Sequence, residues 1–199
     1  MDIDPKDVID SARSAAERDR SRLNATVAIT VALLATFTGI CKVKDDNIVQ
    51  AMQQAQADKL DHWAYYQARN LRQEVAEATL LQLELARPGQ RAGQAAAHDA
   101  AIAKYRALAA EQATKKDELR RQAEQDQVTY DTLNHRDDQF DLSDAAIAIA
   151  ISLLAVTALT QLWALYLVAL LPTAFGVLMG CAGLANWALH PDALVRLLS

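Results

Sequence analysis

The densest group of side chains that could do chemistry lies in residues 62–70, in the polar middle of the chain. It contains His62, Trp63, Tyr65, Tyr66, Arg69 and Asn70. On a helix, His62, Tyr66 and Arg69 share one face, while Trp63, Gln67 and Asn70 share another. One interpretation is a recognition patch for a partner or for a small ligand between subunits. The alternative, which we prefer, is packing and hydrogen bonding along a helix–helix seam.

The histidines are too far apart to predict a metal centre. No HxxxH or ExxH spacing occurs among His62, His98, His135 and His190, so a metal site would need ligands that only the fold brings together. The chain also lacks the GxGxxG, GxxxxGK[ST] and GxSxG motifs of nucleotide-binding and hydrolytic sites. We therefore expect no metal, no cofactor and no enzymatic activity.

Two aspartate pairs and two cysteines complete the reactive residue types. Asp45–Asp46 and Asp137–Asp138 lie beside apolar segments, and we interpret them as solvated charges near a lipid surface. Cys41 and Cys181 lie inside or at the edge of apolar segments, without CxxC spacing. Cysteines in such positions usually behave as small buried apolar residues. They predict neither a zinc site nor a disulfide framework.

Hydropathy predicts three membrane-spanning helices. Residues 23–41 carry no charge, and at about 1.5 Å per residue such a run reaches across a hydrocarbon core of about 30 Å. A second apolar block is long enough for two spans, which we place at 144–162 and 165–189 with a tight turn near 160–164. Pro172 should kink the third span. The lipid bilayer is the first predicted partner.

The polar segment 42–141 predicts an antiparallel helical hairpin that stands out of the bilayer between spans one and two. Its strong helix breakers are Pro88, Gly89 and Gly93, so a turn at 88–93 separates two arms of similar length. Equal arms return the chain to the membrane where it left. The predicted fold is an all-α membrane protein with three transmembrane helices and a long coiled coil.

Heptad spacing predicts which faces of the two arms meet. In the second arm, seven of ten seam positions are apolar or small. The ten are Ile102, Tyr105, Ala109, Gln112, Lys116, Leu119, Ala123, Asp126, Tyr130 and Leu133. The first arm shows a looser stripe through Met52, Leu60, Trp63, Leu71, Val75, Ala78 and Leu85. A turn centred near residues 90 and 91 places Met52 opposite 128–130 and Trp63 near 117–118.

The ends of the chain and the base of the hairpin carry weaker signals. Residues 1–22 read as an N-terminal helix, with Asp4 as its cap, that could run straight into span one. Residues 190–199 read as an amphipathic tail on the membrane surface. Asp141 and Ser143 offer N-cap oxygens for the helix that becomes span two.

Small residues recur every three or four positions in two of the predicted spans, which is typical of close helix packing. In span one they are Ala25, Ala28, Ala32, Ala35 and Gly39. In span three they are Gly176, Gly180 and Gly183. One stripe would serve contacts within the subunit and the other contacts between subunits. We therefore expect a homo-oligomer, with a further membrane protein as a possible partner.

Charge predicts the orientation and excludes one class of partner. The formal net charge of −5 is spread over interleaved acids and bases, so no basic field is present to attract nucleic acid. Five Lys and Arg precede span one and two follow it at once. The positive-inside rule then predicts a cytoplasmic N-terminus and a periplasmic hairpin.

Two sequence motifs carry a family resemblance. Residues 41–59 (CKVKDDNIVQAMQQAQADK) and 62–70 (HWAYYQARN), together with the arrangement of spans, resemble the bacterial family of domain of unknown function 4337. Relatives tend to have basic residues in the turn between the last two spans, where this chain has Thr160, Gln161 and Trp163. The resemblance implies a bacterial inner-membrane protein of uncharacterised role and transfers no functional residues.

These observations favour a non-enzymatic membrane scaffold or accessory protein that self-associates through its spans and hairpin. The alternative is an oligomeric channel or transporter whose pore is lined by Thr30 and Thr38 of span one. Apart from Asp144 at the first position of span two, the spans contain no acidic or basic side chain, although such residues usually mark a transport pathway. A hydrolase or redox enzyme is a distant third possibility.

Overall fold

The computed structural model describes residues 5–89, 91 and 93–189, and the side chains from Arg13 on. Three α-helices and one 3-10 turn make up this part of the chain: α1 (Pro5–Ala86), η1 (Arg87–Gly89), α2 (Ala95–Thr160) and α3 (Trp163–Ala185). The described residues contain no β-strand. The all-α prediction is confirmed. The predicted cap Asp4 and the predicted tail 190–199 lie outside the described residues.

Helix α1 runs unbroken for 82 residues and α2 for 66. Pro5 occupies the first position of α1, where a missing N–H costs nothing. Gly39 is the single glycine in α1, and a glycine inside a helix costs only about 1 kcal/mol. Helix α2 contains neither glycine nor proline and continues through Asp141 and Ser143. The prediction that these two residues cap the start of a helix is therefore wrong.

All three helices are long and apolar enough to cross a membrane. The link between the last two is very short, because α2 ends at Thr160 and α3 begins at Trp163. Gln161 takes a left-handed backbone conformation with φ 58°, and this reverses the chain within two residues. Pro172 lies inside α3.

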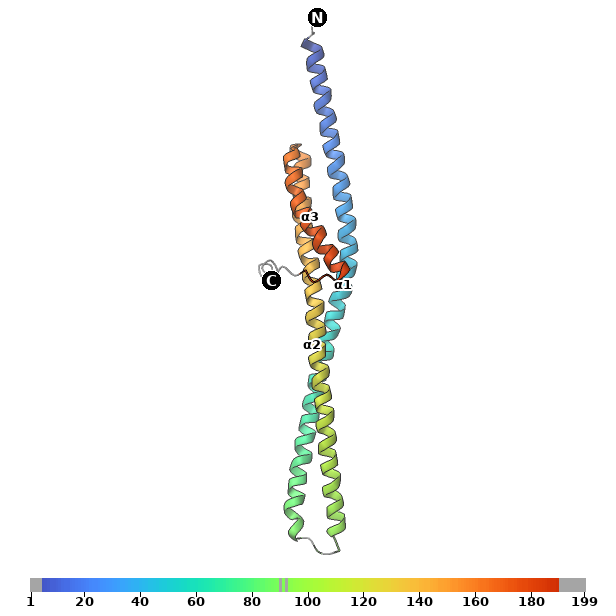
Figure 1. The fold of residues 1–199 in the computed structure, drawn as a ribbon, viewed down its shortest axis with the longest axis vertical. Helices are drawn as coiled ribbons and strands as arrows, with labels where there is room; N and C mark the ends of the chain where they lie inside the picture. The colour runs from blue at the N-terminus through green and yellow to red at the C-terminus, as the bar shows by residue number, and fades with distance from the viewer. Residues whose placement is uncertain (1–4, 90, 92, 190–199) are drawn as a thin grey trace. The chain divides into compact units, whose positions relative to one another are not determined.

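The chain divides into two compact parts. The bundle consists of the residues up to Val49 and those from Leu133 on. Its core joins all three helices through Leu23, Val27 and Leu34 of α1, Ile147, Ala150 and Leu154 of α2, and Ala169 of α3. Figure 1 shows α3 returning along α2 in this part of the molecule.

The hairpin consists of Gln50–Thr132. It contains the C-terminal part of α1, the turn and the N-terminal part of α2, and Figure 1 shows these two arms side by side and joined at the turn. All ten predicted seam positions of the second arm are buried or half-buried, including the polar Gln112, Lys116 and Asp126. The heptad prediction for this arm is therefore confirmed.

Candidate functional site

The cluster at residues 62–70 lies mostly on the seam between the two arms of the hairpin. The ring Nδ1 of His62 is 2.7 Å from Oδ2 of Asp126. Arg69 donates to Oε1 of Gln112 at 3.0 Å, and Lys116 donates to Oδ1 of Asn70 at 3.2 Å. These three interactions use polar groups of the cluster to join the arms, as expected if the cluster packs along a helix–helix seam.

The aromatic members of the cluster behave differently from one another. The Trp63 and Tyr66 rings meet edge to face with centroids 5.3 Å apart, and both are half-buried. Tyr65 points outward and is 62% exposed. The contacts of His62, Arg69 and Asn70 with the second arm therefore favour a seam over a binding patch.

The apolar stripe predicted for the first arm is wrong. Leu60, Leu71, Val75, Ala78 and Leu85 are all exposed, and only Met52 and Trp63 of the predicted stripe are covered. Ten of the positions that are buried or half-buried instead keep strict heptad spacing. They are Met52, Ala55, Lys59, His62, Tyr66, Arg69, Gln73, Ala76, Leu80 and Leu83. Half of this seam is polar or charged, so hydrophobicity alone indicated the wrong face.

The contacts between the arms match the predicted register only in part. Arg69 donates to Gln112, and His98 bonds to the Leu83 carbonyl, as a turn centred at residues 90 and 91 requires. Trp63 was expected near residues 117–118, but its neighbour His62 contacts Asp126. Lys59 donates to Gln127 at 2.5 Å, whereas the predicted turn would bring it close to residue 122. These last two contacts are displaced by between one and two helical turns at 3.6 residues per turn.

An apolar face of the first arm remains uncovered. It contains Leu60, Leu71, Val75, Ala78, Leu81 and Leu85, of which the leucines and the valine are 57–72% exposed. A groove of about 300 Å³ runs beside it, lined by Leu71 and Val75 from one arm and by Tyr105 and Leu108 from the other. We call Leu71, Val75, Ala78, Leu81 and Leu85 the leucine face.

The second arm exposes a complementary row of small residues. Ala96, Ala100, Ala103, Ala107 and Ala110 are all exposed and recur every three or four positions. We call this row the alanine face. Lys104 is exposed beside it and makes no ion pair with the residues that the structure describes.

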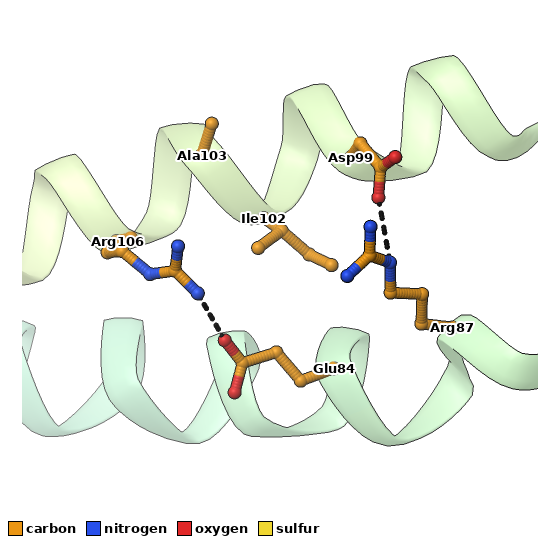
Figure 2. Close-up of a pocket in the computed structure, with 6 residues that line it drawn as sticks. All are labelled: Glu84, Arg87, Asp99, Ile102, Ala103 and Arg106. Atoms are coloured by element: carbon orange, nitrogen blue, oxygen red, sulfur yellow. Dashed lines mark hydrogen bonds and ion pairs between the residues drawn. The ribbon is translucent and has the colours of Figure 1, made fainter.

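A second cavity, of about 490 Å³, lies between the arms near the turn. Figure 2 shows that an ion pair lies on each side of Ile102. Arg106 is 2.6 Å from Glu84, and Arg87 is 3.1 Å from Asp99. The charges that line the cavity compensate one another, so it offers no uncompensated charge to an ionic ligand.

In the bundle, the glycines of α3 pack inside the chain. A Cβ atom added to Gly176 would lie 2.8 Å from Ile147 and 3.1 Å from the Ser143 carbonyl oxygen. At Gly180 it would lie 2.7 Å from the Phe37 ring, and at Gly183 it would lie 2.8 Å from the Phe140 ring. These glycines therefore serve contacts within the subunit.

The small residues of the first predicted span face outward. Ala25, Ala28, Ala32, Ala35 and Gly39 are all exposed. A Cβ atom added to Gly39 would have nothing within 4 Å. The sequence could not distinguish the roles of the two small-residue stripes. In the structure, the α3 stripe contacts neighbouring helices of the same chain, and the α1 stripe is exposed.

Polar side chains also join the helices of the bundle. Thr30 and Tyr166 share a hydrogen bond of 3.0 Å between their hydroxyl oxygens. Ser143 donates to the Gly176 carbonyl at 2.8 Å, which replaces its predicted role as a cap. The Thr30 hydroxyl also donates to the Thr26 carbonyl at 2.9 Å, so it is engaged within the chain.

The interpretation of Asp45 as a solvated charge is wrong. Asp45 is only 4% exposed, and its Oδ2 accepts a bond of 2.7 Å from Lys42. Its other oxygen, Oδ1, is buried without a hydrogen-bond partner. Asp137 of α2 is half-buried, and its carboxyl group contacts that of Asp45. Asp141 lies close enough for its charge to act on both.

Burial, the contact with Asp45 and the charge of Asp141 raise the pKa of Asp137 from 3.8 to about 7. Burial and the charge of Asp45 also raise the pKa of Asp141. The sequence analysis missed this cluster because it interpreted paired aspartates as solvent-exposed. A signal was present: Asp45, Ile48 and Met52 are spaced three and four residues apart, so they share one face of α1, and all three are buried.

The described residues hold no group of three or more His, Cys, Asp or Glu side chains that could bind a metal ion. Cys41 is buried, Cys181 is half-buried, and both are free thiols.

The fold defines an all-helical protein with three helices that could each cross a membrane. The chain belongs to the family of the domain of unknown function DUF4337, whose model matches residues 23–186. The resemblance seen in the two sequence motifs is thereby confirmed. Comparisons with curated proteins and with solved structures gave no match.

Proposed function

We propose that this chain is a three-span protein of the bacterial inner membrane that self-associates and acts as a non-enzymatic scaffold or accessory subunit. The observation that carries the proposal is the difference between the two small-residue stripes. The α3 stripe is filled by Phe37, Ile147 and Phe140, while nothing lies near Gly39 of the α1 stripe. Apolar side chains gain little by leaving lipid, so close backbone approach is what joins helices in a membrane.

The hairpin supplies a second self-association surface. The leucine face of one copy fits the alanine face of the next, because large side chains fill the space that small ones leave. Charge favours the same pairing: Glu74 and Glu77 flank the leucine face, and Lys104 flanks the alanine face. Contacts between different faces of identical subunits are heterologous and build rings or chains of subunits.

Light scattering of the full-length protein in mild detergent tests the proposal. The unmodified protein should have the mass of an oligomer. The double variant Ala28→Leu/Ala35→Leu should lower this mass, because two bulky side chains keep the backbones apart. Leu33→Ile changes an exposed side chain of the same helix outside the stripe and should leave the mass unchanged. A monomeric unmodified protein would refute self-association.

The same measurement separates the hairpin from the spans. Leu71→Lys/Leu85→Lys alters two side chains that are exposed in the single chain, so the chain should fold and the oligomer should weaken. Gln53→Lys, at another exposed position of the first arm, is the control. If only the span-one variant lowers the mass, the spans alone hold the assembly.

We further propose that the N-terminus is cytoplasmic and the hairpin periplasmic, from the five basic residues that precede residue 23. Protease added to intact spheroplasts should then cut the chain between Arg87 and Arg91. Protection in spheroplasts combined with cleavage in inverted vesicles would reverse the orientation.

A further inference from the structure

We propose that Asp45 of α1 and Asp137 of α2 form a proton-binding site, in which one proton held between the two carboxyl groups clasps the helices together within the bundle. The ligand is the proton itself. The site goes beyond self-association, since it is built within a single chain and does not require a second copy.

The first support is the unpartnered oxygen of Asp45. Ionised carboxylates only accept hydrogen bonds, so Asp45 and Asp137 cannot satisfy each other when both are charged. Oδ1 of Asp45 is accordingly buried without a donor, although Oδ2 receives one from Lys42. A proton on Asp137 turns that carboxyl group into a donor to Asp45. An unpaired buried acceptor is costly, and the proton removes that cost.

The second support is the charge around the pair. On α1, the Lys42 ammonium contacts Asp45 at 2.7 Å and Asp46 at 3.6 Å, and Cys41 lies close by. On α2, the remaining neighbours are carboxylates, from Asp138, Asp141 and Asp144. On α3, the neighbouring titratable group is the Cys181 thiol.

A second cation lies close in sequence but points away. The Arg136 guanidinium donates to the Gly183 carbonyl of α3 at 3.0 Å. Lys42 is shared between Asp45 and Asp46. Close like charges in a buried setting favour protonation of one member, as in other carboxyl pairs that share a proton.

The direction of the pH effect follows from the raised pKa of Asp137. With the pKa at about 7 in the folded chain against 3.8 for a free aspartate, folding favours the protonated form. The stabilisation by the shared proton is complete at pH values below the pKa of Asp137 in the unfolded chain. It is lost as the pH rises through about 7, the pKa of Asp137 in the folded chain.

Thermal unfolding of the full-length protein in detergent, followed by helicity from well below to well above pH 7, tests the site. The midpoint should fall as the pH rises. Asp137→Asn supplies a permanent donor in place of the proton, so its midpoint should lose this pH dependence. Asp61→Asn changes an exposed carboxylate of α1 outside the cluster and should keep the dependence of the unmodified chain.

Infrared difference spectra give an independent reading that does not depend on stability. The carbonyl band of a protonated carboxyl group should be present at neutral pH, disappear on titration through pH 7, and be absent in Asp137→Asn. Asp45→Asn should move the titration of this band to lower pH, because the partner charge is removed. A pH slope near pH 7 that is as steep in Asp137→Asn as in the unmodified chain, or a band that still titrates through pH 7 in this variant, would overturn the assignment.

Discussion

The bundle and the hairpin are both made of long helices, yet different contacts hold them. In the bundle, Gly176 and Gly180 let side chains of neighbouring helices come so near that a Cβ atom would lie within 3 Å of them. In the hairpin, half of the first-arm seam is polar, and hydrogen bonds such as Arg69 to Gln112 cross it. The bundle depends on shape, whereas the hairpin depends on pairing between particular polar groups.

The two kinds of contact fix the alignment of the helices in different ways. Close packing around a glycine penalises any added atom, because protein interiors have little spare volume. A polar seam adds less stability but selects one register, since a shifted helix leaves buried polar groups without partners.

The largest expected effect comes from Gly176→Leu. The new side chain meets Ile147 and the Ser143 carbonyl, and overpacking of this kind costs about 1–3 kcal/mol or more. Unfolding of the bundle in detergent, followed by helicity under added denaturant, measures the loss. Ala174→Leu is the matched control, because Ala174 is an exposed position of the same helix. Equal losses in the two variants would contradict the close packing around Gly176.

An intermediate effect is expected at the polar seam of the hairpin. Gln112 is 4% exposed, and Gln112→Leu leaves the half-buried Arg69 without its acceptor, at a cost of about 1–3 kcal/mol. The double variant Arg69→Leu/Gln112→Leu should recover most of that stability, because an apolar pair can replace a buried polar one. A double-mutant cycle on unfolding free energies measures the coupling. Additive losses would show that the pair does not set the contact.

The smallest effect is expected at the exposed ion pairs near the turn. Glu84→Gln breaks the pair with Arg106, whose side chains are 42% and 66% exposed, respectively. Exposed pairs contribute less than about 1 kcal/mol, so the unfolding free energy should hardly change. Repeating the measurement at high salt should leave the variant and the unmodified chain closer still. A loss as large as that of Gln112→Leu would mean that the turn holds the arms together.

The accuracy of sequence reasoning differed between the arms for a physical reason. In the second arm, Ile102, Leu119 and Leu133 lie on the side that meets the first arm, so hydrophobic periodicity found all ten seam positions. In the first arm, Leu71 and Leu85 lie on the outer side. Periodicity identifies the more apolar face of a helix, and that face need not be the one that contacts the same chain.

The candidate site shows the same limit. The cluster at residues 62–70 was expected either as a patch or as a seam, and its contacts to Asp126 and Gln112 correspond to the seam. The carboxyl pair was missed, because a single sequence gives no reason to bring Asp45 and Asp137 together. Their contact depends on how α1 and α2 pack in the bundle.

The sequence by itself determined the helical class, the three apolar segments and the place of the turns. These features follow from local chemistry: few breakers, long uncharged runs, and proline and glycine at 88–93. Only the tertiary structure decided which small-residue stripe is covered, which face of the first arm is free, and that Asp45 is buried. Those outcomes depend on partners far along the chain, since the cost of burying a charge or of leaving a leucine exposed is set by what lies opposite it.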